Sequence, residues 1–369
     1  MRILINAIAL DNQNTGIHYY LKDMVNALAT GAQEHEYILV RQRRDPQLAL
    51  KQISVWNKRL PMAYPYRLFF ILPLLIPYLA IRYRVDAVLE PAHLGPFNLP
   101  KRIKRITIIH DLTAIKFPAL HRWHSQILQN IFLKNILRRA NLIITNSRHT
   151  SRDVVEFESS LERKTHCISP SVNCDTSLAQ SAPQHIQISG RYMLCIGTIE
   201  PRKNLICLLR AYEKYRHDTS GALKLVIAGG MGWKYQSFLE LLENSKYRND
   251  ILITGYVSEI EKAQLLANCL FFIYPSLYEG FGLPVLEAIH YGKAVIVSET
   301  SSLSEVAGDC ALYVNPKSED DIAEKIARLS TDDALRSSLE DNCAAQAQKF
   351  SWKGFAVEFE TLLTRLHGK

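Results

Sequence analysis

The chain has 369 residues, of which 47% are hydrophobic and 22% charged, a composition that excludes a disordered or fibrous protein. This length is too great for one ordinary hydrophobic core and predicts two domains of roughly 150 to 200 residues each. The net charge of +8 is unevenly distributed: residues 1–185 contain 24 Lys and Arg against 13 Asp and Glu, and residues 186–369 contain 20 against 23. No nucleic-acid recognition motif accompanies the basic half.

The first half of the chain alternates short apolar runs with amphipathic segments. Residues 17–29 and 125–140 carry the apolar spacing of helices. Apolar runs that end at polar residues, as buried strands do, occupy residues 2–8, 36–40, 86–90, 105–111 and 142–147. Strands that alternate with helices predict a parallel sheet covered by helices on both faces.

Residues 68–81 form a continuous apolar stretch, LFFILPLLIPYLAI. It is shorter than the roughly 20 residues that span a bilayer, and Pro73 and Pro77 interrupt it, so we predict no transmembrane span. Two interpretations remain open. The stretch is either a helix buried in the first domain, which is the commoner case, or a helix at a membrane interface, which the flanking arginines and tyrosines favour.

A polar segment over residues 176–190 separates the two halves and is predicted to be a linker. Beyond it, strands are predicted at residues 192–197, 223–229, 250–255, 269–275, 294–298 and 310–314, and helices at 204–218, 258–268, 319–349 and 352–367. The expected fold class is α/β, with two Rossmann-like doubly wound domains, residues 1–185 and 186–349, that face each other across a ligand-binding cleft.

The cysteines and the start of the chain bear on its cellular setting. Seven cysteines are scattered, and none forms a C-x-x-C pair, so no metal-site or redox motif is present. A reducing, cytoplasmic setting is the simple inference, and the first ten residues lack the apolar core and cleavage site of a secretory signal. No G-x-G-x-x-G motif follows the first strand, which excludes a dinucleotide oxidoreductase.

The polar residues that close the strands of the second domain are candidates for ligand contacts. Doubly wound sheets bind ligands beyond the carboxyl ends of their strands. One of these strands is followed by Gly197 and then by Arg202 and Lys203 at the start of a helix. Another is followed by a turn that contains Gly280 and Gly282. Both segments should therefore lie at the same edge of the sheet.

The glycine-rich turn is suited to an anion. Its glycines let backbone amides approach closely, and the helix that starts near Leu283 or Pro284 points its positive end at the same place. With two cations nearby, a diphosphate is the natural occupant. Glu287 would then accept hydrogen bonds from a ribose and Glu279 from a sugar. The alternative is that both glutamates are solvated surface residues. That interpretation would fit an isolated pair at this spacing, but the glycine-rich turn between these two favours a ligand site.

Several motifs together resemble those of retaining glycosyltransferases of family 4, which have the GT-B fold, and the resemblance covers nearly the whole chain. The longest, YEGFGLPVLEAIHYGKAVIVSETSSLSEVAGDCALYVNP, spans residues 278–316. Further matching segments are NTGIHYY at 14–20, IIHDL at 108–112, ANLIITNSRHTSRDV at 140–154 and GTIEPRKNL at 197–205. Residues 350–369 resemble the family's last helix, which crosses back onto the first domain. These motifs specify the family far better than the sugar.

The resemblance implies a role for each matching residue. Glu287 should hold the nucleotide ribose and Glu279 the transferred sugar, while the backbone amides of residues 280–284 bind sugar hydroxyls and phosphate. Arg202 and Lys203 should neutralise the leaving diphosphate. The expected catalytic residues are His110, Lys203, Arg202 and Glu279, and the expected substrate-binding residues are Gly16, Gly197, Thr198, Gly280, Phe281, Gly282, Leu283 and Glu287.

Two expected site residues belong to the first domain. Gly16 should let the first helix approach the diphosphate. His110 should lie beside hydroxyls of the transferred sugar; the alternative is a histidine that only closes its strand. For Asp111 we favour a structural role over orienting His110 or contacting the acceptor. The chain departs from the family at Thr198, where many members have arginine, and Arg202 is expected to supply the missing charge.

The implied activity is transfer of a hexosyl group from a nucleotide-diphosphate sugar to a glycan or lipid-linked acceptor, with retention, in surface-polysaccharide biosynthesis. GDP-mannose is the first expected donor and a UDP-sugar the second. No D-x-D motif is present, so we expect neither a metal nor another cofactor, with helix ends, Arg202 and Lys203 in place of the cation. The alternatives are a sugar-nucleotide epimerase or hydrolase, and a non-catalytic subunit of an assembly complex.

The basic excess of the first half suggests an anionic partner. We expect a lipid-diphosphate acceptor and reversible, peripheral contact with the anionic inner face of the membrane, from the cytoplasm, and no nucleic-acid partner. The alternative is a solvated basic surface without a partner. The residues that stand out are Arg41, Arg43, Arg44, Lys101, Arg102, Lys104 and Arg105.

Overall fold

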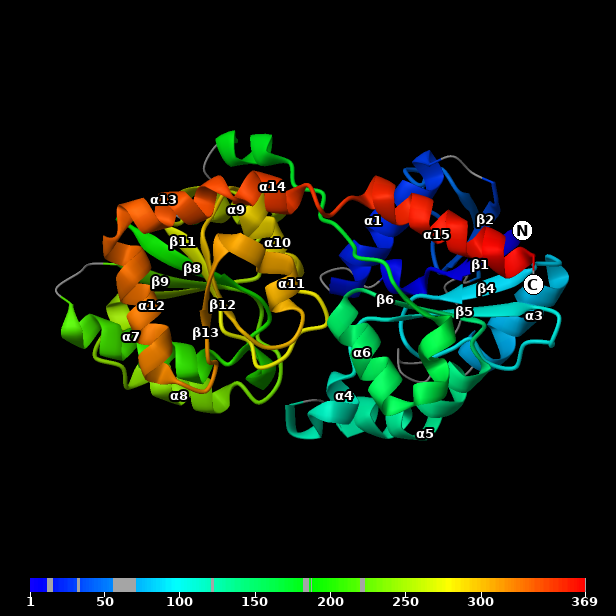
Figure 1. Ribbon diagram of the computed structural model, residues 1–369, viewed down its shortest axis with the longest axis horizontal. Coiled ribbons are helices and arrows are strands. Elements are labelled where there is room, and N and C mark those ends of the chain that lie inside the picture. The colour runs from blue at the N-terminus through cyan, green and yellow to red at the C-terminus, as the bar shows by residue number, and fades with distance from the viewer. Residues whose placement is uncertain are drawn as a thin grey trace. The chain divides into compact units, whose positions relative to one another are not determined.

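A computed structural model of the chain consists of two units, each built around its own parallel sheet (Figure 1). The structure describes residues 1–11, 16–31, 34–55, 71–120, 123–181, 186, 188–219 and 223–368. Unit 1 comprises Met1–Pro118, Trp123–Val172 and Phe350–Lys369, and unit 2 comprises Ala119–Arg122 and Asn173–Lys349. The division after Val172 falls earlier in the chain than the predicted boundary at residue 185.

The sheet of unit 1 has seven strands in the order β3-β2-β1-β4-β5-β6-β7, all parallel to their neighbours. The strands are β1 (Arg2–Asn6), β2 (Glu36–Arg41), β3 (Lys51–Ser54), β4 (Ala87–Glu90), β5 (Lys104–Ile109), β6 (Leu142–Thr145) and β7 (Thr165–Cys167). All five predicted strands are confirmed. The two edge strands, β3 and β7, have no apolar run that would reveal them, because an edge strand is only partly buried.

Two long helices of unit 1, α1 (Gly16–Thr30) and α5 (Trp123–Arg139), agree with the predicted ones. A third, α6 (Arg148–Phe157), begins at Ser147, whose hydroxyl accepts a hydrogen bond from the amide of Thr150. Shorter helical segments are η1 (Ile8–Asp11), α4 (Thr113–Lys116), η3 (Pro118–Leu120) and η4 (Ser159–Lys164). The short segments carry too few turns to show a helical period in the sequence.

The apolar stretch at 68–81 is described from residue 71 onward. It forms a π-helical segment, η2 (Ile71–Leu75), that continues into α3 (Ile76–Arg82). One face is buried in unit 1 and includes Ile71, Ile76 and Leu79, whereas Leu74, Tyr78 and Ile81 are 58%, 61% and 47% exposed. The interpretation as a buried helix therefore holds for one face of the segment, and contact of its other face with a membrane stays a prediction. Within the described ranges, no helix combines the length and apolar character needed to cross a bilayer.

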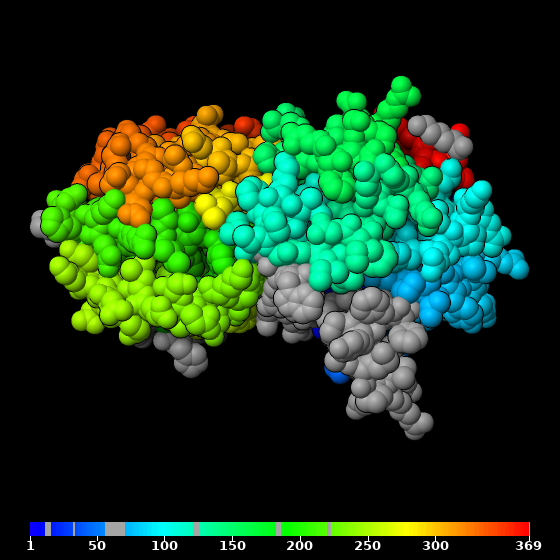
Figure 2. Space-filling view, turned by 90° about the horizontal axis from the view of Figure 1, so that it is seen from below, coloured from blue at the N-terminus to red at the C-terminus, as the bar shows by residue number. Residues whose placement is uncertain are grey.

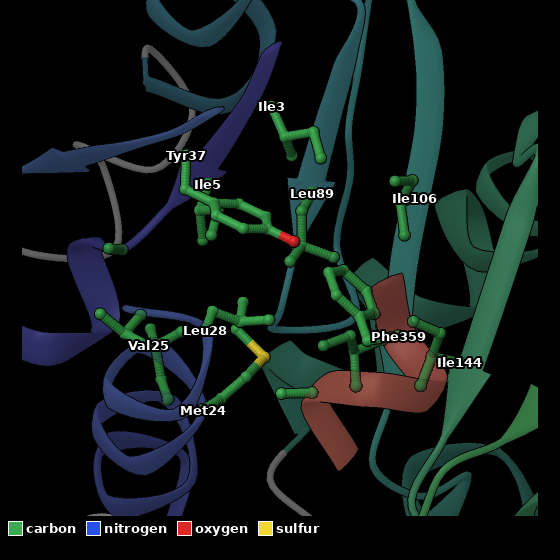
Figure 3. Packing of buried hydrophobic residues seen from close by; sticks show 14 of the residues in the cluster. Ile3, Ile5, Met24, Val25, Leu28, Tyr37, Leu89, Ile106, Ile144 and Phe359 are labelled. Atoms are coloured by element: carbon green, nitrogen blue, oxygen red, sulfur yellow. The ribbon is translucent and has the colours of Figure 1, made fainter. Parts of the chain in front are cut away.

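The core of unit 1 joins the start of the chain to its end. The last helix, α15 (Trp352–His367), packs against α1 and the sheet. Figure 3 shows Ile3 and Ile106 from the sheet, Met24 from α1 and Phe359 from α15 around one apolar interior. Each of these side chains is fully buried. Burial of such side chains is the main source of stability in a domain of this kind.

The sheet of unit 2 has six strands in the order β10-β9-β8-β11-β12-β13, again all parallel. The strands are β8 (Tyr192–Ile196), β9 (Lys224–Ala228), β10 (Ile251–Gly255), β11 (Phe271–Tyr274), β12 (Val295–Ser298) and β13 (Ala311–Val314). All six are predicted from the sequence. The order places β8 beside β11, so the segments that follow these two strands meet at one edge.

The helices of unit 2 lie on both sides of its sheet (Figure 1). The predicted α7 (Leu205–Asp218) and α9 (Glu259–Asn268) are present, but the single helical segment predicted at 319–349 is three helices. Asp332 starts the second of them by accepting a hydrogen bond from the amide of Leu335. The remaining helices are α8 (Gln236–Glu243), α10 (Leu283–His290), α11 (Leu303–Ala307), α12 (Glu319–Thr331), α13 (Asp333–Asp341) and α14 (Cys343–Ala347). In the predicted linker, Thr176–Gln180 forms a 3-10 helix, η5.

Replacing Phe359 by alanine tests how much α15 contributes to unit 1. The ring of Phe359 is fully buried and stacks on that of Phe355. Because the truncation loses buried apolar surface and leaves a cavity, we expect the free energy of unfolding to fall by about 3–5 kcal/mol in urea denaturation. Val357→Ala, on the exposed side of the same helix, should change it by less than about 0.5 kcal/mol. Equal effects of the two substitutions would contradict this role of α15.

Candidate active site

The carboxyl edge of the unit 2 sheet carries most of the predicted site residues. Gly197 directly follows β8, and the turn that leads to α10 follows β11. A Cβ atom at residue 197 would lie 3.3 Å from the side chain of Lys203, so glycine allows Lys203 to pass close to the strand end. Thr198 is exposed at the same edge. Parallel strands thus bring together residues that are far apart in the sequence.

Glu279 lies at the centre of this edge and is almost fully buried, with 7% of its surface exposed. Its Oε1 accepts a hydrogen bond from Lys203 Nζ at 2.6 Å, and its Oε2 accepts one from Arg202. Lys203 also donates to the hydroxyl of Tyr274, and its Nζ lies 4.6 Å from the centre of that ring. Glu200 pairs with Arg202 at 2.7 Å. We call these five residues the Glu279 cluster, in which two carboxylates compensate two cations.

The pKa values within the cluster follow from burial and from the cations. Burial favours the neutral form of Glu279, but Arg202 and Lys203 outweigh it and lower the pKa of this carboxyl. Burial and repulsion from Arg202 lower the pKa of Lys203. Burial, and then Glu279, raise the pKa of Tyr274, so its hydroxyl stays protonated. Because a phosphate is also an anion, it could take the place of the ionised carboxylate as the partner of the two cations.

The turn between β11 and α10 is fixed by hydrogen bonds. The hydroxyl of Ser302 donates to the carbonyls of Glu279 and Phe281, both at 2.9 Å. Gly282 has a φ of +111° directly before α10, and a Cβ atom there would lie 2.7 Å from Leu303. Conformation and space therefore both require glycine at this position. The helix begins at Leu283, as predicted.

Glu287 lies on α10 and pairs with a lysine of the neighbouring helix α9. Its Oε1 is 2.7 Å from Lys262 Nζ, and the two side chains are 16% and 18% exposed. Neither Glu279 nor Glu287 is thus a freely solvated surface residue. Glu287 belongs to a second polar contact of unit 2, with partners other than those of the Glu279 cluster.

Gly16 and His110, the other two predicted site residues, belong to unit 1. Gly16 is the first residue of α1, and among the described residues no atom lies within 4 Å of where its Cβ would be. Its contact with a diphosphate stays a prediction. Residues 14 and 15 of the matching motif at 14–20 lie outside the described residues.

His110 follows β5, and both of its ring nitrogens have partners. Nδ1 accepts a hydrogen bond from Asn146 Nδ2 at 2.7 Å, and Nε2 donates to the carbonyl of Pro91 at 2.7 Å. These contacts assign the neutral tautomer with its proton on Nε2. Burial, and then His93, lower the pKa of His110 to about 4. The ring is thus held neutral within unit 1, and its contact with a sugar stays a prediction.

Asp111 has a structural contact. Its Oδ1 accepts a hydrogen bond from the amide of Thr113 at 2.8 Å and so stabilises the start of α4. This contact agrees with the structural role that the sequence analysis favours for Asp111.

The sequence analysis does not identify several partners of the predicted residues. Tyr274 and Glu200 stand inside or next to the motifs, but nothing in the motifs signals their contacts with Lys203 and Arg202. The other partners that it misses are Asn146 and His93, which contact His110, and Lys262, which pairs with Glu287.

Two family descriptions match the chain: Glycosyltransferase Family 4 over residues 14–176 and Glycosyl transferases group 1 over residues 180–350. The O-antigen chain mannosyltransferase B of Escherichia coli is 34% identical over 275 residues, which are 72% of this chain and 71% of that protein. The chain belongs to glycosyltransferase family 4. It is therefore an enzyme of the glycosyltransferase class, as the motifs predict.

More distant relatives of this glycosyltransferase extend the comparison. An N-acetylgalactosamine-N,N'-diacetylbacillosaminyl-diphospho-undecaprenol 4-alpha-N-acetylgalactosaminyltransferase of Campylobacter jejuni is 27% identical over 246 residues, 66% of this chain and 65% of that protein. The solved structure of a sucrose-phosphate synthase from Thermosynechococcus elongatus has a TM-score of 0.77 at 18% identity and covers 100% of this chain and 99% of that one. This likeness confirms the expected α/β GT-B fold of two Rossmann-like domains.

The neutral state of His110 predicts a pH dependence of stability. Because the folded-state pKa of about 4 lies below the ordinary 6.5, the unfolded chain binds the proton more readily, and stability is lost as the pH falls from about 6.5 towards 4. Between pH 7.5 and pH 5, we expect the wild type to lose about 2 kcal/mol more unfolding free energy than His110→Gln. Urea titrations at the two pH values measure this difference.

A matched control uses a solvent-exposed histidine. His217→Gln, on α7, should lose as much stability as the wild type over the same pH interval, because the His217 side chain is 83% exposed. Parallel pH profiles of the wild type and His110→Gln would contradict the assignment of a buried neutral ring.

Proposed function

We propose that this glycosyltransferase transfers a mannosyl group from GDP-mannose, with retention, to a glycan or lipid-linked acceptor of surface-polysaccharide biosynthesis. The observation that carries the proposal is the buried Glu279 cluster, where Lys203 and Arg202 are held at the carboxyl edge of the sheet. Similarity to an O-antigen chain mannosyltransferase supports the choice of sugar and pathway. A UDP-sugar is the second candidate donor.

The chain's own residues divide the work of this reaction. The bond between C1 of the sugar and the phosphate oxygen breaks, and the acceptor oxygen bonds to C1 on the same face, while the acceptor proton passes to the departing phosphate. Lys203 and Arg202 donate to the diphosphate as its negative charge grows. The amino end of α10 adds its positive dipole. Before the donor binds, Glu279 satisfies both cations; afterwards it accepts hydrogen bonds from the sugar.

Two further residues contact the donor in this proposal. Glu287 accepts hydrogen bonds from the ribose, and His110 lies beside hydroxyls of the transferred sugar, its neutral ring neither attracting nor repelling the diphosphate. The reaction needs no divalent metal, because Lys203 and Arg202 already place positive charge where the leaving group develops its negative charge.

The basic residues of unit 1 fall into two groups, and only one supports an anionic partner. Arg41 is buried and pairs with Asp11 at 3.2 Å and with Asp45 at 3.3 Å. Arg105 donates to the carbonyl of Leu99. The assignment to a partner surface is therefore wrong for Arg41, whereas for Arg105 and Lys104, which are half-buried, it stays a prediction. The exposed members are Arg43, Arg44, Lys101 and Arg102, to which the structure adds Arg82 and Arg84.

We propose that η2 and α3 touch the inner face of the membrane. Leu74, Tyr78 and Ile81 form an exposed apolar ridge that ends beside Arg82 and Arg84. An anionic lipid surface would cover the apolar side chains and pair with the arginines. Figure 2 shows the face of unit 1 on which α5 lies. Ile127 and Ile131 of this helix are also exposed. The diphospho-undecaprenol in the name of the Campylobacter relative supports a lipid-diphosphate acceptor.

The donor proposal predicts which nucleotide stabilises the protein. GDP should raise the melting temperature more than UDP, ADP or dTDP at equal concentration, because a ligand that binds only the folded state stabilises it by mass action.

Glu279→Ala and Lys203→Ala should each lower mannosyl transfer from GDP-mannose at least about tenfold, or roughly 1.4 kcal/mol of transition-state stabilisation, with EDTA present. Thermal-shift and product assays measure the two effects.

Controls separate chemistry from folding. Because removal of one partner of a buried ion pair also destabilises the fold, each variant is compared below its own melting temperature, and Glu279→Gln keeps the side-chain shape. Lys224→Ala, at the opposite end of β9, should retain full transfer. Folded Glu279 and Lys203 variants with near-native turnover would remove the site assignment. A larger shift with UDP would favour a UDP-sugar, and product formed without acceptor would indicate hydrolysis or epimerisation.

The membrane proposal predicts salt-sensitive binding to anionic vesicles. A variant with Leu74, Tyr78 and Ile81 all changed to serine should lose at least about tenfold in co-sedimentation with phosphatidylglycerol vesicles, because it removes the apolar part of the contact. Raising the salt from about 0.05 to 0.5 M should weaken binding of the wild type by screening the arginines.

The matched control changes exposed apolar residues elsewhere. Leu252→Ser in unit 2 and Val357→Ser on α15 should leave vesicle binding unaltered. Wild-type protein that stays in the supernatant with anionic vesicles at low salt would refute the membrane contact.

A further inference from the structure

Lys262 is a cation whose position the helix dipole does not favour. It lies in the first turns of α9, four residues after the N-cap Ser258. The positive end of the helix dipole is there, so a cation is unfavourable at this point. The helix start is already complete without it, because Ser258 and Glu261 form a reciprocal capping box. The pair with Glu259, three residues earlier on the same helix, offsets part of this cost.

The interaction that offsets this position joins two helices. Lys262 Nζ lies 2.7 Å from Glu287 on α10 and 3.1 Å from Glu259 on its own helix. Burial lowers the pKa of Lys262, but the carboxylates of Glu287 and Glu259 outweigh burial and raise it, so the side chain is fully charged. The pair with Glu287 is largely withdrawn from water, and such pairs contribute little net stability. Its geometric effect is to fix the Glu287 carboxylate.

The pair also lies where a ligand is expected. α9 follows β10 and α10 follows β11, so Lys262 and Glu287 both stand near the helix starts at the carboxyl edge of the unit 2 sheet. Glu287 is the residue to which the proposed function gives the ribose. A carboxylate on a short helix has rotational freedom, and a hydrogen bond of 2.7 Å from the partly buried ammonium group of Lys262 removes much of it.

We propose that Lys262 is the positioning residue of the nucleotide-ribose site: its ammonium group holds the Glu287 carboxylate in the orientation that accepts hydrogen bonds from the ribose hydroxyls. This inference rests on the proposed role of Glu287 and adds a residue that no motif of the chain indicates. Lys262 acts through Glu287 and takes no part in bond making or breaking, so its loss weakens nucleotide binding and leaves the turnover of bound donor unchanged.

The test compares a ribonucleotide with its analogue that lacks both ribose hydroxyls. Dissociation constants of GDP and 2′,3′-dideoxy-GDP, and of the two corresponding uridine nucleotides, are measured by calorimetry on the full chain. We expect Lys262→Met to weaken binding of the preferred ribonucleotide about tenfold, because the acceptor of its hydroxyls loses its orientation. The same substitution should change binding of the dideoxy analogue less than about twofold.

Matched variants make the result specific. Lys325, on α12, is also 18% exposed and also paired with carboxylates, but it lies on another helix. Lys325→Met should therefore leave both affinities unchanged. Lys262→Arg keeps the charge and should restore ribonucleotide affinity to within about threefold of the wild type. Melting curves establish whether each variant is folded. If the methionine variant is unfolded, the affinities of the arginine variant are used for the test.

The outcomes separate this inference from the proposed function. Equal weakening of ribo- and dideoxynucleotide by Lys262→Met, or weakening of neither, would overturn the positioning role while nucleotide binding by the wild type stands. If the wild type binds neither GDP nor UDP, the donor proposal itself fails. With Glu287→Gln in the background, Lys262→Met should add no further loss, because the two residues act as one unit.

Discussion

One buried ion pair organises the candidate active site. A carboxylate and an ammonium group withdrawn from water are tolerable only when they are paired. Glu279 and Lys203 follow two neighbouring strands, and their contact at 2.6 Å requires those strand ends to meet. Three features accommodate this contact. Gly197 leaves room for the side chain of Lys203, Tyr274 accepts a hydrogen bond from it, and Ser302 holds the turn that carries Glu279. The charges that hold this turn are those that the proposed reaction uses.

The parallel sheet explains why the polar residues of unit 2 gather where they do. The strands of the unit all point the same way, so the turns that lead from a strand to a helix lie at one edge, and the helices that follow a strand start there. Glycine is needed where a turn must be tight, as at Gly282. The two glutamates of the motif share this edge but have separate cationic partners, Lys203 for Glu279 and Lys262 for Glu287. Their different surroundings suit the different roles proposed for them.

The sequence predicts the fold well because buried strands and long amphipathic helices leave periodic patterns. The edge strands β3 and β7 and the break at Asp332 escape prediction, since partial burial and a single capping side chain leave only weak signals. At the site, the motifs predict Glu279, Arg202 and Lys203 as ligand contacts, yet their pairing with one another depends on tertiary packing. Lys262 shows the limit most clearly, because nothing in the sequence around it indicates a partner on another helix.

The final helix constrains the order in which the chain can complete its structure. Helix α15 supplies Phe355, Phe359 and Leu363 to the same interior as the first strand and helix. During synthesis, the apolar surface of the amino-terminal sheet therefore stays open until residues 352–367 have left the ribosome, whereas nearly all of unit 2 has been translated by then. A chain truncated near residue 350 would expose that surface and become a substrate for chaperones and proteases.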